Sequence, residues 1–459
     1  MRILICGAGQ VGYSIARQLS KEDNQITMID YNPDLIQKIN DNLDVRAFVG
    51  HAAHPNVLKA AGAEDADMLI AVTYSDEVNM VACQIGYSLF NIPTRIARIR
   101  HQNYLKPDWQ SLYSNENLAL NVIISPEIEV ARAITRRLHS PGTLDIIPFA
   151  DDKVRVIAVR AMEGCPMTNL PVSLIRQKAG AASLNIIGVS SEGKFSVPTA
   201  ESILRAGDDV YFIAASHDTK RVMNLFGHDE REARRAIILG GGNIGLFLAQ
   251  GLEEDVDHDI KLKIVEFSRE RAELIASTLN KTTVLNGSAL DREVLMEAGI
   301  DHTETVIAVT NDDETNILSC LLAKRFGAER TIALVNNATY APLLTDLGID
   351  VTVNPRETTV SRILEHVRKG RITAVHAISD GAAEIIEAVA MATSSLVGKS
   401  IGELKLPAGI IFGALVRKDD IIIPSIETTI AEGDHIIILA TSAMVRKVEK
   451  IFSVSLEYF

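Results

Sequence analysis

The sequence predicts an α/β protein with two Rossmann-like, doubly wound parallel-sheet domains, each followed by a small α+β domain. Three observations predict this fold. Short apolar strand candidates alternate with helix candidates, which is typical of a parallel sheet covered on both faces. A glycine-rich turn follows the first strand candidate, and the whole pattern then occurs a second time. The 459 residues are enough for several domains.

The second half of the chain repeats the first. Residues 71–79 (AVTYSDEVN) resemble residues 308–316 (AVTNDDETN), and a fainter match joins residues 210–215 to residues 436–441. Pro141 and Gly142 break the first half between a large and a small part, and a densely charged run at 228–235 links the halves. We therefore expect four domains, at residues 1–140, 141–230, 231–370 and 371–459.

Apolar periodicity places the elements of the first half. Strands are expected in the large domain at residues 2–6, 26–29, 45–49 and 68–72, and helices at 12–19, 34–40, 56–61 and 77–89. The small domain is expected to hold strands at 154–159, 184–189 and 210–215 and helices at 170–176 and 218–225.

A glycine fingerprint follows the first strand and opens the first helix, the context that dinucleotide binding requires. Its residues are Gly7, Ala8, Gly9, Gln10, Val11 and Gly12. The glycines allow a tight turn, close approach of the backbone to a pyrophosphate, and packing of the helix on the strand. The free N–H groups at the helix start favour phosphate. Alternatively, the turn only closes the helix against the strand.

An acid completes the fingerprint in each half. Asp30 ends the second strand, where a carboxylate accepts hydrogen bonds from ribose hydroxyls and repels a 2′-phosphate, so NAD(H) is favoured over NADP(H). The second copy has Glu266 in the acid position, and its fingerprint residues are Gly240, Gly242, Asn243, Ile244 and Gly245. Agreement of strand, helix, acid and repeat favours nucleotide binding over the purely structural alternative.

Polar residues follow the fourth strand of each half. Thr73 and Thr310 end these strands, and ligands of doubly wound sheets bind at the carboxyl ends of strands. A threonine there reaches the nucleotide or simply suits a strand end, and the sequence leaves both interpretations open. Asp76 and Asp313 begin the next helices, and helix capping explains them without a ligand.

Arginines distinguish the two halves. Arg98 and Arg100 point to one face of the fifth strand, whereas the second half has Leu334 and Asn336 at these positions. A guanidinium at a strand end suits bidentate binding of a phosphate, although a solvated edge charge is equally compatible. We expect the two sites to bind phosphate-rich ligands unequally.

Composition and charge restrict the function further. The net charge of −13 disfavours direct binding of nucleic acid or anionic lipid. No apolar run approaches the roughly 18 residues of a membrane-spanning helix, and the four cysteines form no C-x-x-C pair. Because His51 and His54 lie in a loop, they are interpreted as part of a polar loop rather than as a metal site. These features predict a cytoplasmic protein.

Over nearly its whole length the chain resembles the TrkA family, the regulatory proteins of Trk potassium-uptake systems. The resemblance rests on residues 7–12, the Gly50-His51-x-x-His54-Pro55 loop, and residues 61–67, 95–100, 240–245 and 308–314. It implies alternating RCK N and RCK C domains that bind NAD(H), with ATP and ADP competing at related sites. Asp30, Thr73 and Arg98 would belong to the first nucleotide site, and Glu266 and Thr310 to the second.

The resemblance also implies partners. A homo-oligomeric ring, a tetramer, would dock on a TrkH/TrkG-like potassium transporter subunit, and the protein would thereby lie at the inner face of the cell membrane. The helices after Pro126 and Pro355, with apolar Ile128, Val130 and Ile134 in the first, are candidates for contacts between neighbouring units.

Three functions compete. The first is a nucleotide-sensing regulator without enzymatic activity, which the resemblance favours. The second is an NAD-dependent oxidoreductase with duplicated Rossmann domains, but no histidine or lysine constellation suggests the acid–base group that such an enzyme needs. The third is an assembly protein with vestigial sites, against which the intact glycines and acids of both halves argue.

Overall fold

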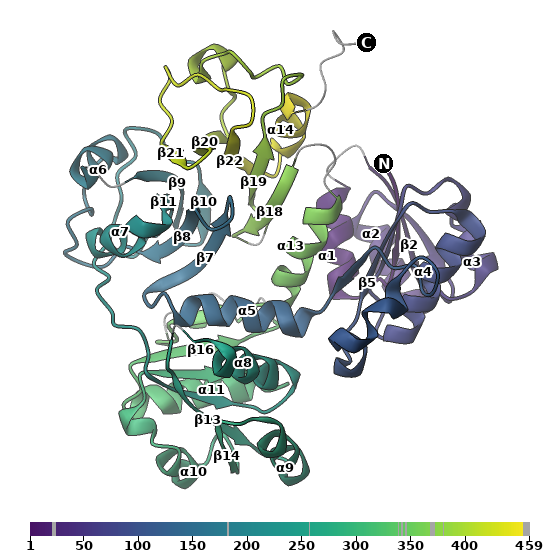
Figure 1. Cartoon of the computed structure of the whole chain (residues 1–459), viewed down its shortest axis with the longest axis horizontal. Helices are drawn as coiled ribbons and strands as arrows, with labels where there is room; N and C mark the ends of the chain where they lie inside the picture. Colours follow the sequence, from purple (N-terminus) through teal and green to yellow (C-terminus); the bar gives the residue numbers. More distant parts are fainter. Residues whose placement is uncertain are drawn as a thin grey trace. The chain divides into compact units, whose positions relative to one another are not determined.

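A computed structural model describes residues 1–20, 24–180, 183–256, 258–337, 339–340, 343–344, 347–367, 372–379 and 381–452 (Figure 1). The chain forms two compact units, one of residues 1–129 with 356–368 and one of residues 130–355 with 369–459. Each unit is described by itself. The domain boundary expected at residues 370 and 371 lies outside the described residues.

The first unit contains a six-stranded parallel sheet in the order β3-β2-β1-β4-β5-β6. Its strands are β1 Arg2–Cys6, β2 Gln25–Asp30, β3 Arg46–Val49, β4 Met68–Ala71, β5 Thr94–Arg98 and β6 Val122–Ile124. The helices are α1 Gln10–Leu19, α2 Pro33–Asn42, α3 Pro55–Ala60 and α4 Asp76–Phe90. The strand order reverses between β1 and β4, and ligands of doubly wound sheets bind at such a switch point.

The second Rossmann-like sheet, in the second unit, has the same order, β14-β13-β12-β15-β16-β17. Its strands are β12 Arg235–Leu239, β13 Lys261–Glu266, β14 Thr283–Asn286, β15 Thr305–Ala308, β16 Arg330–Leu334 and β17 Val351–Val353. The helices are α8 Asn243–Glu254, α9 Arg269–Thr278, α10 Arg292–Glu297 and α11 Asp313–Arg325. Identical strand order in both sheets confirms the predicted fold and the duplication.

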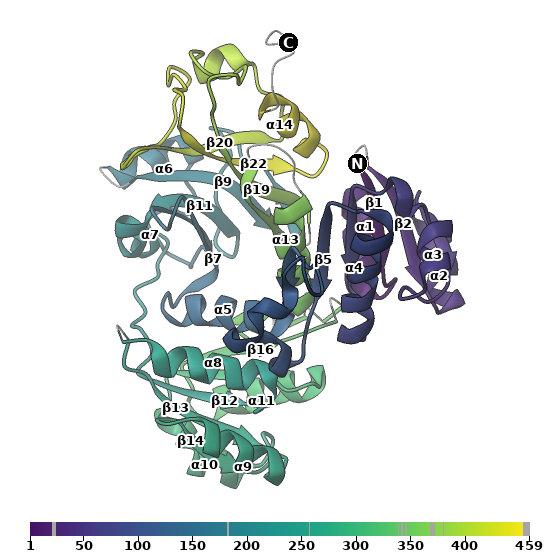
Figure 2. The same ribbon diagram turned by 45° about the vertical axis from the view of Figure 1, so that its right-hand side comes forward.

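Two helices are exchanged between the halves. Helix α5, Pro126–Leu138, comes from the first half, but its buried Val130 and Ile134 share a core with the second sheet. Figure 2 shows α5 alongside α8. Conversely, helix α13, Pro355–Val367, comes from the second half, and its Ile363 and Leu364 pack into the core of the first sheet (Figure 1). Each sheet is thus completed by a helix from the other half of the chain.

The small domains have antiparallel sheets of equivalent order, β10-β9-β11-β8-β7 and β18-β19-β22-β20-β21. The first comprises β7 Thr143–Phe149, β8 Val154–Arg160, α6 Val172–Ala179, β9 Leu184–Ser191, β10 Lys194–Ser196, β11 Asp209–Ala215 and α7 Thr219–Leu225. The second comprises β18 Ile372–Ile378, β19 Ala383–Val389, β20 Ile410–Arg417, β21 Asp420–Ile422, β22 His435–Thr441 and α14 Val445–Phe452. The sequence predicted three strands in the first domain and missed β7 and β10.

The two small domains pack on each other through their sheets. Apolar residues of both sheets form one core, with Ile213 from β11 and Leu439 from β22 both fully buried. The amide of Asn185 donates hydrogen bonds to the carbonyl oxygens of Phe412 and Gly413, over 3.1 and 2.9 Å. The first of these sheets is therefore covered on both faces, because successive residues of β8 and β11 belong alternately to its own domain core and to the shared core.

Candidate nucleotide-binding sites

The first glycine loop is shaped by close backbone packing. Gly7 has a φ of +110°, and a Cβ atom there would lie 2.9 Å from the backbone nitrogen of Thr73. A Cβ atom on Gly12 would lie 1.9 Å from the carbonyl oxygen of Gly7. In contrast, a Cβ atom on Gly9 would meet nothing within 4 Å. Gly7 and Gly12 are therefore required by the fold, whereas Gly9 faces open space at the start of α1.

The second loop repeats this geometry. Gly240 has a φ of +108° and abuts Thr310, and a Cβ atom on Gly245 would lie 2.1 Å from the carbonyl oxygen of Gly240. A Cβ atom on Gly242 would meet nothing within 4 Å. The same middle glycine is open in both halves, although packing alone does not demand glycine there.

The helices that follow present uncapped N-termini. Gly9 precedes α1 and Gly242 precedes α8, neither N-terminus has a side-chain cap, and neither first turn holds an acidic residue. Free N–H groups and the helix dipole make such an end favourable for an anion. Val11 and Ile244 turn their side chains to the cores, so they can offer a ligand only backbone N–H groups. Gln10 is exposed and Asn243 is half-buried.

Each predicted acid is hydrogen-bonded to its own glycine loop. The carboxylate of Asp30 accepts from the N–H groups of Ala8, over 2.6 Å, and Asn32, over 2.9 Å. The carboxylate of Glu266 accepts from the N–H groups of Gly241, over 2.6 Å, and Ser268, over 2.8 Å. Because a carboxylate offers about four lone-pair positions, both acids hold the loop and keep acceptor capacity for hydroxyl groups.

An exposed aromatic side chain follows each acid. Tyr31 is 73% exposed and Phe267 is 80% exposed. Large aromatic side chains bury much apolar area when they find a partner, and these two are left exposed at matching positions beside the acids. The sequence analysis missed them, although the acid–aromatic pair occurs in both halves.

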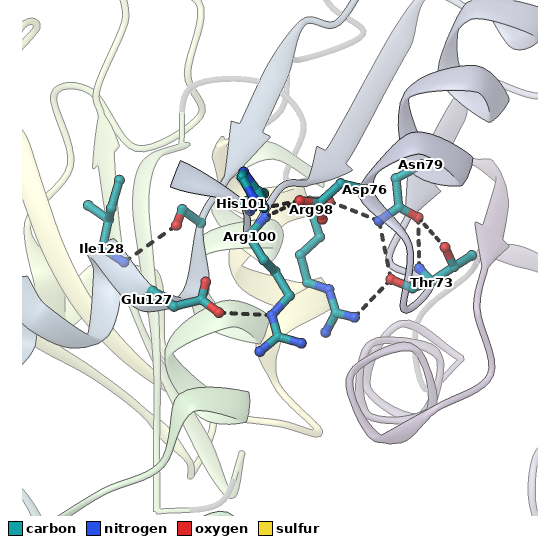
Figure 3. A network of polar contacts seen from close by, with 9 residues as sticks. Thr73, Asp76, Asn79, Arg98, Arg100, His101, Glu127 and Ile128 are labelled. Atoms are coloured by element: carbon teal, nitrogen blue, oxygen red, sulfur yellow. Dashed lines mark hydrogen bonds and ion pairs between the residues drawn. The ribbon is translucent and has the colours of Figure 1, made fainter. Parts of the chain in front are cut away.

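Thr73 is fixed by a buried asparagine (Figure 3). The hydroxyl and the N–H of Thr73 both donate to Oδ1 of Asn79, over 2.7 and 2.8 Å. The amide of the fully buried Asn79 donates to the carbonyl oxygens of Thr73 and Arg98, over 3.2 and 2.9 Å. Because the Thr73 hydroxyl already donates its hydrogen bond within the protein, it can only accept hydrogen bonds from a ligand.

Thr310 and Asn316 repeat this arrangement in the second half, with the hydroxyl donating to Oδ1 of Asn316 over 2.7 Å. The asparagine amide again reaches the fifth strand, at the carbonyl oxygen of Leu334, over 2.9 Å. Both asparagines close the matched repeats of residues 71–79 and 308–316, which is the signal that could have found them.

Arg98 and Arg100 have different surroundings (Figure 3). Nη2 of Arg98 donates to the carbonyl oxygen of Thr73 over 2.8 Å, while its Nε is buried without a partner. Burial, aided by the charge of Arg100, lowers the pKa of Arg98. Nε of Arg100 donates to the nearly buried Glu127 over 2.8 Å. Burial lowers the pKa of Arg100, but its hydrogen bond to Glu127 outweighs burial and raises the pKa overall.

The capping interpretation of Asp76 and Asp313 is wrong. Ser75 caps α4 by accepting from the N–H of Val78, whereas the carboxylate of Asp76 accepts from the N–H groups of Arg100, over 2.9 Å, and His101, over 2.7 Å. Asp313 likewise accepts from the N–H groups of residues 336 and 337. Both aspartates fasten the loop after the fifth strand because that loop passes over the start of the helix.

The second glycine loop carries an arginine that the sequence analysis missed. Nε of Arg271, in α9, donates to the carbonyl oxygen of Gly241 over 2.8 Å, and its Nη2 lies 3.4 Å from Oδ1 of Asn243. Aligned on the acids, the first half has Leu35 here, which packs on the core. The signal was faint, because it required comparing the helices after the acids rather than the fifth strands.

Two further observations concern the loop at His51 and the helices. Nδ1 of His51 accepts from the N–H of Ala53 over 3.3 Å. No helix within the described residues combines the length and apolarity needed to span a membrane.

Comparison with known proteins identifies the family. The TrkA-N domain model matches residues 3–126 and 236–355, and the TrkA-C domain model matches residues 385–453. The chain is 47% identical to the Trk system potassium uptake protein TrkA of Azorhizobium caulinodans, with 100% of both chains covered. It is 40% identical to the same-named protein of Halomonas elongata, also with 100% of both covered.

Solved structures agree on the fold. The GsuK RCK domain has a TM-score of 0.59 at 21% identity, covering 98% of this chain and 94% of that one. A GsuK channel bound to NAD has a TM-score of 0.58 at 21% identity, covering 98% of this chain and 78% of that one. With two sheets of RCK type and full-length relatives at such identity, this chain belongs to the TrkA family of Trk system potassium uptake proteins.

Proposed function

We propose that this chain is the nucleotide-sensing regulatory subunit of a Trk-type potassium uptake system. It binds NAD(H), and ATP or ADP at the same sites, and its nucleotide state controls a membrane subunit that conducts potassium. One observation carries the proposal: in both halves an uncapped helix N-terminus and an acid flank a glycine, Gly9 or Gly242, that faces open space.

Each part of NAD(H) has a matching group at these sites. The pyrophosphate fits the N–H groups at the start of α1 or α8. The ribose fits the remaining acceptor capacity of Asp30 or Glu266, and the adenine fits the exposed Tyr31 or Phe267. A channel of the same fold has been solved bound to NAD, which supports the assignment of ligand class.

The binding residues we propose are those of both fingerprints with their acids and strand ends. They are Gly7, Ala8, Gly9, Gln10, Val11, Gly12, Asp30, Thr73 and Arg98 in the first site, and Gly240, Gly242, Asn243, Ile244, Gly245, Glu266 and Thr310 in the second. To these we add Tyr31, Phe267 and Arg271. Arg98 offers its buried, unpartnered Nε to a phosphate, whereas Arg100 is held by Glu127 and offers less.

We further propose that the chain acts as a homo-oligomeric ring, a tetramer, on a TrkH/TrkG-like potassium transporter subunit at the inner face of the cell membrane. Family membership supports a role in potassium uptake. A nucleotide shifts the equilibrium between two conformational states of such a ring only if it binds the two states with different affinity. If nucleotide binding changes the affinity of the ring for the transporter by some factor, docking on the transporter must change the affinity for nucleotide by the same factor.

The test measures NADH and ATP affinity of the full chain with and without the purified transporter, together with the mass of the free assembly. A ring whose affinities change on docking supports the proposal, and a monomer whose affinities ignore the transporter contradicts it. Asp30→Ala should weaken nucleotide binding by roughly 1.5–3 kcal/mol, since it removes charge-assisted hydrogen bonds. Sustained NADH oxidation with a defined substrate would favour the oxidoreductase alternative instead.

A further inference from the structure

Three side chains with metal-ligating atoms lie close together at the C-terminal end of helix α5, beside the second Rossmann-like domain. His139 follows α5, Asp255 follows α8, and His258 lies in the connection to β13. Their ligand atoms all lie within 4.8 Å of one another. In the part of the chain that the structure describes, this is the one such group of three or more histidine, cysteine or acidic residues.

The spacing within the group is already close to that of a metal centre. Nε2 of His139 lies 3.0 Å from Oδ2 of Asp255, and Nδ1 of His258 lies 3.1 Å from the same oxygen. The two imidazole rings are 3.8 Å apart between centroids. Tetrahedral ligands at zinc–nitrogen and zinc–oxygen bond lengths lie about 3.3 Å from one another, so small side-chain adjustments would suffice.

The surroundings suit a ligand role. Both ring nitrogens of His139 are buried, and the contact of Nε2 with Oδ2 of Asp255, over 3.0 Å, is the ion pair that the ring makes there. On the far side of His258, Nε2 lies 3.7 Å from a carboxylate oxygen of Glu232. A carboxylate behind a ligating histidine is the usual way to fix the orientation of the ring.

We propose that His139, Asp255 and His258 bind a zinc-class transition-metal ion. Two imidazoles with one carboxylate favour Zn²⁺, Co²⁺ or Ni²⁺ over Mg²⁺ and Ca²⁺, which prefer all-oxygen sites. Three protein ligands leave one tetrahedral position for water. The site is independent of the nucleotide sites, because none of its residues belongs to a glycine loop.

The site would fasten the exchanged helix to the domain on which it packs. Arg330 already holds this helix end, donating to the carbonyl oxygens of Arg137, over 3.0 Å, and Thr143, over 2.8 Å. A metal ion would add bonds from the helix end to the connection between α8 and β13. Binding to the folded state alone raises the stability of the protein in proportion to the logarithm of metal concentration over Kd.

The experiment titrates Zn²⁺ into metal-stripped, untagged full-length protein by calorimetry, and Co²⁺ with detection of its visible absorption. Wild type should bind one equivalent, show intense bands of tetrahedral Co²⁺, and gain thermal stability with Zn²⁺. Loss of a group that only orients a ligand already lowers metal affinity about tenfold to a hundredfold, so His258→Ala and Asp255→Asn, which change ligands themselves, should each lower affinity by at least about tenfold. His217→Ala changes a side chain that is 77% exposed and should bind like wild type.

Asp255→Asn retains the shape of the side chain and so tests the site even if His258→Ala fails to fold. The proposal is overturned if wild type binds neither ion more tightly than Asp255→Asn does. It is equally overturned if the Co²⁺ bands persist unchanged in that variant, because the ion would then sit at another group of side chains.

Discussion

Arg271 and Leu35 occupy equivalent positions after the acids of the two halves, yet only Arg271 reaches a glycine loop, donating to the carbonyl oxygen of Gly241 over 2.8 Å. On the fifth strands the arginine belongs to the first half instead: Arg98 stands there, and Leu334 stands at the equivalent position of the second half. Each candidate site therefore has a guanidinium, but from a different element. We therefore expect both sites to bind phosphate, but with the guanidinium contacting the phosphate from a different position in each site.

Removing each arginine should weaken phosphate-rich ligands at its own site. We expect Arg98→Leu to weaken ATP about tenfold to a hundredfold where the second site is blocked by Gly242→Val, because a hydrogen bond to a charged group contributes roughly 1.5–3 kcal/mol. Arg271→Leu should do the same where Gly9→Val blocks the first site. Calorimetry with ATP and adenosine measures this, and equal losses for both ligands would rule out a phosphate contact.

Alanine at two glycines of one loop should separate binding from folding. Gly9→Ala meets open space, so the free energy of unfolding should stay near that of wild type while the added methyl group weakens NAD(H) binding. Gly12→Ala forces a Cβ atom to 1.9 Å from the carbonyl oxygen of Gly7, which costs about 1–3 kcal/mol of stability or more. Denaturant unfolding and NADH fluorescence together check both. A destabilised Gly9→Ala protein would contradict the assignment of an open ligand space.

Tyr31→Ser should weaken every ligand that carries adenine. Stacking of a base on an aromatic ring is worth about 1–3 kcal/mol, so NADH and ATP should lose affinity by similar factors. Inorganic pyrophosphate, which lacks adenine, serves as the control ligand and should be unaffected. Phe267→Ser is the matched change in the second half, and a loss of pyrophosphate binding in either variant would show that the loop itself had moved.

Asn79→Ala should destabilise the first Rossmann-like domain. The substitution leaves the N–H of Thr73 and the carbonyl oxygen of Arg98 without their partner in a buried place, and each unsatisfied group costs about 1–3 kcal/mol. We expect a loss of about 2–4 kcal/mol in the free energy of unfolding. Val81→Ala, on the exposed face of the same helix, is the control, and a similar loss there would refute the assigned role of Asn79.

The linker histidine should make stability depend on pH. The His228 ring contacts Glu230 over 2.9 Å and the carbonyl oxygen of Arg160 over 2.7 Å. Burial lowers its pKa, but the hydrogen bonds to Glu230 and Arg160 outweigh burial and raise the pKa above the ordinary value of 6.5. A raised pKa adds stability that is complete below 6.5 and is lost as the pH rises through the folded-state pKa.

We therefore expect the free energy of unfolding to fall as the pH rises from 6.5 through the raised folded-state pKa of His228, and to fall less in His228→Asn. Denaturant unfolding at several pH values gives the slope. His217→Asn, at an exposed position, is the control and should keep the wild-type slope. A wild-type slope in His228→Asn would assign the pH dependence to other groups.

Local pattern predicted most of the fold, because alternation of strands and helices and the glycine turns are properties of neighbouring residues. It placed Asp30 and Glu266 beside their loops correctly. Local pattern did not predict side-chain roles that depend on contacts with residues distant in the sequence. An aspartate at a helix start suggests a cap, yet Asp76 turns to the loop at Arg100 and His101 instead.

The sequence also could not show on which sheet an amphipathic helix packs. Val130 and Ile134 show that α5 buries one face, but the two sheets of the repeat offer similar apolar surfaces, so periodicity cannot decide which one the helix covers. Arg271 was missed for a related reason: its loop contact comes from a helix whose first-half counterpart, at Leu35, has only a packing role.

The exchange of α5 and α13 has a consequence for how the chain is made. On the ribosome, the first Rossmann-like sheet emerges long before residues 355–367, and until then the core to which α13 contributes Ile363 and Leu364 lacks these side chains. The nascent first half must therefore wait for the second, and a chain cut between them leaves each piece with an uncovered apolar face. The two halves are similar in sequence, yet each core includes a helix from the other half.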